Sequence, residues 1–170
     1  SYAARIDCLY ALKAIGFQTG CGFMVGTPFQ TTEMLADELA FLTQFKPHMA
    51  GIGPFLPHRD TPFKDFGGGS VQTTLKMLAL SRLLCPEILL PATTALGTAA
   101  AGGRERGILA GANVVMPNLS PASCREKYSI YDNKLNTGAE SSEGLAELAA
   151  RMKKIGRVLA TCRGDSLVKN

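Results

Sequence analysis

The most telling stretch of this chain is GIGPFLPHRDTP, residues 51–62, in which a short apolar run ends in a loop rich in glycine and proline. Gly51 and Gly53 allow the backbone to approach a flat ligand closely, and the prolines stiffen the loop. No long charged or polar side chain intrudes before His58. The stretch is therefore typical of a loop that cradles a ligand.

The same pattern, an apolar run followed by a loop, occurs three more times, and each copy precedes a stretch that can form a helix. The other copies cover residues 18–28, 89–98 and 113–121. Alternating strands and helices of this length favour parallel strands joined by right-handed crossovers. An eight-stranded barrel needs about 250 residues. Four such units in 170 residues therefore predict an α/β fold that is half of a (β/α)8 barrel.

Periodicity and capping signals give the expected elements. Strands are expected at residues 17–25, 49–55, 89–94 and 113–116. Helices are expected at residues 2–15, from the cap at 31 to 45, from the cap at 70 to the stop at Pro86, at 104–110 and at 142–155. We assign residues 1–135 to the half barrel and residues 136–170 to a C-terminal helical extension.

The composition indicates a folded protein of the cytoplasm. Hydrophobic residues make up 46% and charged residues 19% of the chain, and the net charge is +4. We expect no targeting leader and no membrane span. We also expect no nucleic-acid partner, because the basic residues near the end fall on one face of an amphipathic helix without aromatic neighbours. The five cysteines show no CxxC spacing, so we expect no metal site within the chain.

Five motifs in unbroken order resemble the C-terminal half of the HydE family of [FeFe]-hydrogenase maturases, which are radical S-adenosylmethionine (SAM) enzymes related to biotin synthase. The motifs are GFMVGTPFQT at 22–31, GIGPF at 51–55, PATTA at 91–95, GGRE at 102–105 and GANVVMPN at 111–118. The family has a complete (β/α)8 TIM barrel. Its 4Fe-4S cluster, held by a CxxxCxxC loop after the first strand, reductively cleaves SAM.

This sequence contains no CxxxCxxC triplet. The resemblance implies that it holds the fifth to eighth strands of such a barrel. We therefore expect the chain alone to bind neither the cluster nor SAM, to carry no catalytic residue and to be inactive. The full-length protein is expected to be a radical SAM enzyme.

The resemblance also implies a set of binding residues. Those implied for the cofactor SAM are Met24, Gly26, Gly53, Pro54, Phe55 and Leu56, and those implied for the substrate are Arg5, Met49, Thr93, Thr94 and Tyr128. Arg5 would clamp a substrate carboxylate with its planar guanidinium. Met24 is equally well explained as strand core, and Thr93-Thr94 as ordinary β-branched packing. His58 and Asp60 are better explained as loop structure than as an acid–base pair.

The leading hypothesis is a maturase that acts on a small iron-bound or amino-acid-like substrate while the hydrogenase cofactor is assembled. A methylornithine synthase or a biotin synthase-like enzyme is the alternative within the same superfamily. A half barrel that only binds, without catalysis, is the alternative of another class. The inward faces of Phe23, Val25, Ile52 and Val114 would lack an opposing half, so we expect the isolated chain to form a homodimer or larger assembly.

Overall fold

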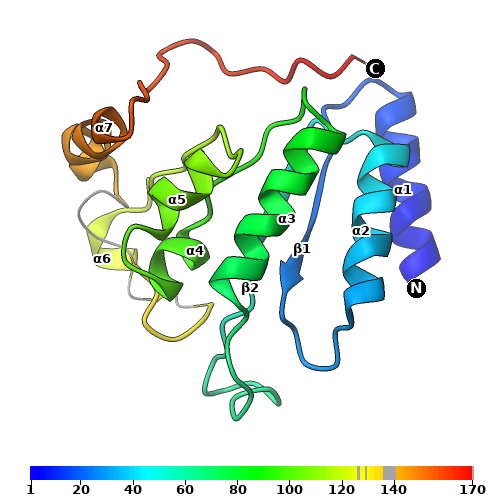
Figure 1. Cartoon of the computed structure of the whole chain (residues 1–170), viewed down its shortest axis with the longest axis horizontal. Coiled ribbons are helices and arrows are strands. Elements are labelled where there is room, and N and C mark those ends of the chain that lie inside the picture. Colours follow the sequence, from blue (N-terminus) through cyan, green and yellow to red (C-terminus); the bar gives the residue numbers. More distant parts are fainter. Residues whose placement is uncertain (126, 129, 136–140, 170) are drawn as a thin grey trace.

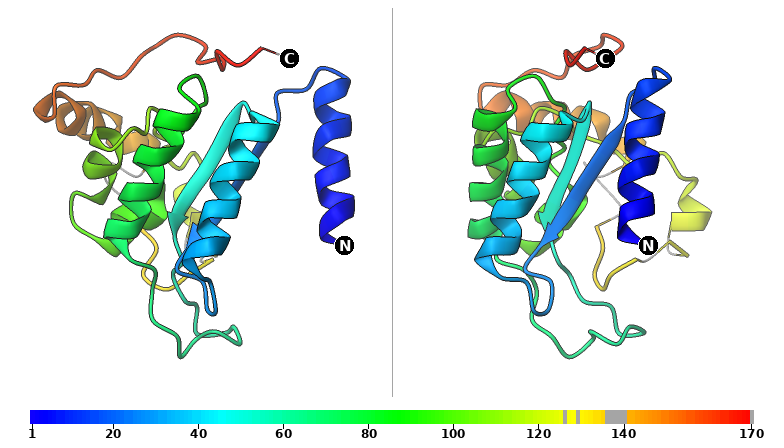
Figure 2. Two further views of the ribbon diagram at one scale, coloured as in Figure 1. Left: turned by 45° about the vertical axis from the view of Figure 1, so that its right-hand side comes forward. Right: turned by 90° about the vertical axis from the view of Figure 1, so that its right-hand side faces the viewer.

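The computed structural model describes residues 1–125, 127–128, 130–135 and 141–169. Two parallel strands, β1 (Gly20–Val25) and β2 (Met49–Pro54), lie at the centre with a row of helices along one side (Figures 1 and 2). Their register pairs Gly20 with Met49 and Val25 with Pro54. The fold is α/β with parallel strands, as the sequence predicts.

The helices begin where the sequence places hydroxyl caps. In α2 (Thr32–Phe45), Thr31 Oγ1 accepts from the Met34 N–H at 3.3 Å, and in α3 (Val71–Leu84), Ser70 Oγ accepts from the Thr73 N–H at 3.2 Å. Each cap satisfies a backbone donor that has no partner within its helix. Capping thus explains why both helices start within one residue of the expected position.

The α1 helix (Tyr2–Ala14) stands at one end of the row of helices. Lys13 Nζ donates to the carbonyl oxygens of Phe45 and Lys46, both at 2.7 Å, and the Tyr10 ring meets the Phe45 ring edge-on at 5.1 Å. A cation at the C-terminal end of a helix is favourable because the carbonyls there lack partners. These contacts fix α1 to the end of α2.

The third and fourth expected strands are shorter than the sequence indicates. They appear as isolated parallel bridges, Met49 with Leu89 and Pro91 with Val114. The expected strand at 89–94 is wrong at its end, because Thr93 caps α4 (Thr94–Ala99). Neither α4 nor the single turn α6 (Ala122–Arg125) is predicted from the sequence.

One face of the strands packs against the helices and builds the core. Val25, Ala50 and Ile52 are each at most 1% exposed and pack with Leu42 of α2 and Leu78 of α3. The expectation that Val25 and Ile52 point into the barrel is therefore wrong.

The opposite face of the strands is the inner face of the barrel. It carries Gly20, Gly22 and Met24 from β1 and Met49, Gly51 and Gly53 from β2. Alternate strand residues point to opposite sides. The strand face that packs against the helices carries branched apolar residues, whereas the inner face consists mostly of glycine.

The last elements close the other end of the core. Leu148 and Met152 of α7 (Leu145–Lys154) are buried with the strand residues, and Arg151 of α7 forms an ion pair with Glu105 of α5 (Gly103–Leu109). A short 3-10 turn, Ser142–Gly144, precedes α7 where the sequence predicts one continuous helix. The division at 135/136 stays a prediction, since residues 136–140 lie outside the described residues.

Candidate functional site

The C-terminal ends of the strands border a hollow of about 490 Å3, which we call the rim pocket. Parallel strands present their C-terminal ends at one edge, where α/β proteins bind ligands. Its lining brings together five of the predicted residues, Met24, Gly53, Pro54, Leu56 and Thr93, with Gly22, Phe23, Gly51, Ala95, Ile130 and Tyr131.

Glycines make the floor of the rim pocket from backbone. A Cβ on Gly22 would lie 2.0 Å from Gly51 O, and a Cβ on Gly53 would lie 2.7 Å from Thr93 Oγ1. Such distances exclude any side chain without movement of the neighbours. Residues 22 and 53 are therefore glycine because neighbouring atoms fill the space where a side chain would begin, and they present only backbone to the pocket. Met24, with 54% of its surface exposed, supplies a polarisable side chain on the same face.

The two neighbouring threonines have different places. Thr93 lines the pocket, and its Oγ1 also accepts from the Leu96 N–H at 3.3 Å, which caps α4. Thr94 is the first residue of α4, and its Oγ1 accepts from Arg104 Nη2 at 3.5 Å. Thr94 is not among the lining residues, so only one of the pair meets the pocket directly.

Gly26 and Phe55 support the pocket from behind rather than line it. The Phe55 N–H donates to Val25 O at 2.8 Å, and the Gly69 N–H donates to Phe55 O at 2.7 Å. Gly26 has a φ of +80°, and its N–H donates to Gln30 Oε1 at 2.6 Å. These bonds set the positions of the loops that follow β1 and β2.

Three predicted substrate residues lie away from the rim pocket. Met49 is on the same face but at the opposite end of β2, where it borders another hollow of about 510 Å3 beneath residues 157–164. Arg5 is exposed on α1. Tyr128 is 61% exposed, with Lys134 Nζ 4.3 Å from its ring centre. Their assigned roles stay predictions.

Sequence reasoning missed Ile130 and Tyr131, which line the pocket from a segment that crosses the inner face of the strands (Figure 2). No strand or helix periodicity marks this segment. The available signal was the pair of large apolar residues, Ile130 and Tyr131, shortly after Tyr128 in a stretch that is otherwise polar.

The histidines do not face the pocket. His58 Nδ1 accepts from the Asp60 N–H at 3.1 Å, which closes a local turn. His48 is buried, and its Nδ1 accepts from the Thr19 N–H at 3.0 Å. Burial, with a smaller effect of Lys13, lowers the pKa of His48. Among the described residues, no group of three or more His, Cys, Asp or Glu side chains could hold a metal ion.

Comparison with known proteins places this geometry in context. No protein-family model matches the chain. It is 48% identical over 135 residues to the [FeFe] hydrogenase maturase subunit HydE of Thermotoga maritima, which covers 79% of this chain and 39% of the relative. It is 27% identical over 158 residues to the 3-methylornithine synthase of Methanosarcina barkeri, covering 92% of this chain and 43% of the relative.

The fold has a match among solved structures. The crystal structure of methylornithine synthase (PylB) superposes with a TM-score of 0.76 at 26% identity, over 94% of this chain and 46% of that chain. PylB is a radical SAM TIM-barrel enzyme, so the fold of this chain is half of a radical SAM barrel. Within that class, the chain is a homologue of the HydE maturase. It spans less than half the length of each of these relatives.

Within the residues that the structure describes, no helix is long and apolar enough to cross a membrane.

Proposed function

We propose that this chain forms the C-terminal part of the SAM and substrate cavity of a radical SAM enzyme that matures the [FeFe]-hydrogenase cofactor. The observation that carries the proposal is the rim pocket, whose floor is glycine backbone at the C-terminal strand ends of a HydE homologue. Such a floor suits a flat adenine ring, with Met24 against its face and the backbone of 53–56 at its edge.

The described residues fit the nucleoside part of SAM but not its iron–sulfur cluster. Gly22, Gly51 and Gly53 line the pocket with backbone and Met24 adds an exposed apolar side chain, a surface that suits a flat ring. Within the described residues, no group of three or more His, Cys, Asp or Glu side chains could hold a metal ion. We propose that the cluster ligands come from residues outside this chain. A bound SAM and cluster supply radical chemistry, and the share of this chain is to bind, orient and exclude water.

The higher sequence identity to HydE favours a maturase over a methylornithine synthase or a biotin synthase. It is 48%, against 27% for the methylornithine synthase, although the latter match covers more of the chain. The substrate we propose is accordingly a small iron-bound or amino-acid-like molecule, with Arg5, Thr94 and Tyr128 contributing in the full-length protein. We also propose that the isolated chain is inactive and associates through the uncovered inner face and edge of β1.

The test uses the full-length protein, reconstituted anaerobically with iron and sulfide. We expect SAM binding, release of deoxyadenosine under reduction, and restored hydrogenase activity in cells that lack their own maturase. Deoxyadenosine release without restored maturation would refute the assignment as a maturase. Absence of SAM binding by a protein with a complete cluster would refute the proposed cavity.

A pair of glycine variants links that result to the rim pocket. Gly53→Ala brings a methyl group within 2.7 Å of Thr93 Oγ1, so Thr93 must shift within the pocket lining. We expect about tenfold weaker SAM binding, which corresponds to about 1.4 kcal/mol. Gly20→Ala is the matched control, because it lies on the same face at the other end of the strands, with its Cβ 3.6 Å from Met49 O. Equal affinities of the two variants would contradict the assigned position.

A further inference from the structure

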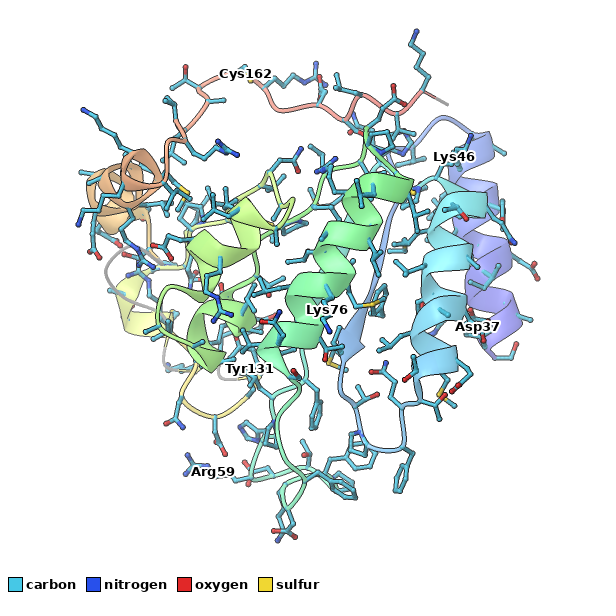
Figure 3. All side chains as sticks on the ribbon, viewed as in Figure 1. Asp37, Lys46, Arg59, Lys76, Tyr131 and Cys162 are labelled. Atoms are coloured by element: carbon cyan, nitrogen blue, oxygen red, sulfur yellow. The ribbon has the colours of Figure 1, made fainter. Side chains whose placement is uncertain are left out.

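Two hydrogen bonds join the loop after β2 to the segment after α6. Arg59 Nε donates to Asp132 Oδ1 at 3.0 Å, and the Asp132 backbone N–H donates to Pro57 O at 3.3 Å. Pro57 directly follows the pocket residue Leu56, and Asp132 directly follows the pocket residue Tyr131. The bonds therefore fasten one wall of the rim pocket to another. Figure 3 shows Arg59 and Tyr131 at the same end of the molecule.

The turn that carries Arg59 is bonded to itself. The Thr61 N–H and Thr61 Oγ1 both donate to His58 O, at 3.0 and 2.8 Å, and the Asp60 N–H donates to His58 Nδ1. Local side-chain bonds of this kind fix a loop without a regular element. The backbone of Arg59 is therefore already held in place, so less conformational entropy is lost when its side chain forms the ion pair with Asp132.

The far side of the same loop is anchored by aromatic contacts. Phe63 meets Phe55 at 6.4 Å and Phe66 at 5.6 Å between ring centres, and Phe66 meets Phe29 of the loop after β1 at 5.7 Å. All three pairs are edge-to-face, the arrangement that aromatic rings prefer. The loop 57–69 therefore contacts the loop after β1 on one side and Asp132 on the other.

The exposure of the Arg59–Asp132 ion pair makes it weak enough to open and close. Its side chains are 75% and 33% exposed for Arg59 and Asp132, and exposed pairs contribute little in water. A side-chain hydrogen bond from Arg59 holds the pKa of Asp132 below its ordinary value, so the pair is charged at neutral pH. The bond from the Asp132 backbone N–H to Pro57 O also joins these two segments.

We propose that the Arg59–Asp132 pair is a latch that holds residues 130–132 over the rim pocket and slows the release of the bound ligand. The identity of that ligand rests on the proposed function, and the closure of the wall does not. Arg59 and Asp132 are positioning residues, because they act through Leu56 and Tyr131. Opening the pair would allow a ligand to enter or leave without movement of the strands.

The latch is tested in the full-length protein with Arg59→Gln, Asp132→Asn and the charge-reversed double variant R59D/D132R. Hydrogen exchange at residues 130–135 and the dissociation rate of SAM are measured. We expect both to rise about two- to fivefold in the single variants, the range for one exposed ion pair, and to return toward the original values in the double variant. Arg163→Gln is the matched control, since Arg163 pairs with Asp165 at 3.2 Å on the exposed tail.

The two measurements separate the latch from the proposed function. Unchanged exchange at 130–135 in the single variants overturns the latch whether or not SAM binds. Faster exchange with an unchanged dissociation rate overturns its role in retaining the ligand. If the unmutated protein binds no SAM, the proposed function fails while the exchange result still decides whether the pair holds the wall.

Discussion

Replacement of Gly69 by alanine should destabilise the protein far more than the same change two residues earlier. A Cβ on Gly69 would lie 1.9 Å from Val25 O and 2.8 Å from the Phe55 nitrogen, which are the two ends of a backbone hydrogen bond. Neither is the end of a flexible side chain, so the loops after β1 and β2 must separate. Gly67→Ala is the control, because nothing lies within 4 Å of its Cβ.

The magnitude follows from two costs. Overpacking of a close-packed site costs about 1–3 kcal/mol, and loss of the bond between Phe55 and Val25 costs about 1 kcal/mol. We expect a loss of roughly 3 kcal/mol in the free energy of unfolding, which lowers Tm by about 6–12 °C for a domain of this size. Gly67→Ala should change Tm by less than about 2 °C.

Thermal and urea unfolding followed by circular dichroism would measure both variants. Gly69→Ala should also weaken ligand binding in the rim pocket, because Phe55 adjoins its lining residues Pro54 and Leu56. A Gly69→Ala protein as stable as Gly67→Ala would refute the close approach of the loops after β1 and β2.

Three further predictions concern ionisation and thiol access. Hydrogen bonds from the backbone and from Arg125 lower the pKa of Glu143 to about 2, so the stabilisation by its carboxylate is present above pH 4.5 and is lost as the pH falls toward 2. Glu143→Gln should flatten the dependence of unfolding free energy on pH over that range, and an unchanged dependence would contradict the prediction. Burial lowers the pKa of His48, so unfolding free energy should fall as the pH drops below 6.5, and His48→Gln should remove that slope. Burial raises the pKa of Cys21 to about 11, so iodoacetamide at pH 8 should label exposed Cys162 long before Cys21; equal rates measured by mass spectrometry would show that Cys21 is accessible.

Much of the architecture could be predicted from local signals. The caps at Thr31 and Ser70 and the break at Pro86 determine helix positions through the chemistry of adjacent residues, so α2 and α3 lie where they were expected. The strand at 89–94 was set too long because β-branched Thr93 and Thr94 favour a strand locally, whereas the hydroxyl of Thr93 caps α4. Cap and strand signals coincide at this position, and only the tertiary structure separates them.

The site was partly predictable for a similar reason. Glycine and proline in residues 51–57 report a constraint on the backbone itself, so the floor of the rim pocket could be derived from sequence. Ile130 and Tyr131 line the pocket although they are far in sequence from β1 and β2, and no local pattern predicts such a long-range contact. The prediction that Val25 and Ile52 face the barrel interior was wrong because an apolar residue on a barrel strand can face either the helices or the interior.

The pairing order of the strands determines the order in which parts of the protein unfold. β1 pairs with β2, Met49 then bridges to Leu89, and Pro91 bridges to Val114, so each unit contacts the unit that follows it in sequence. Cooperativity in such an arrangement is passed between neighbours, as in repeat proteins. A lesion near Val114 should loosen its own unit first and reach β1 last, so amide protection would be lost in steps along the chain rather than at once.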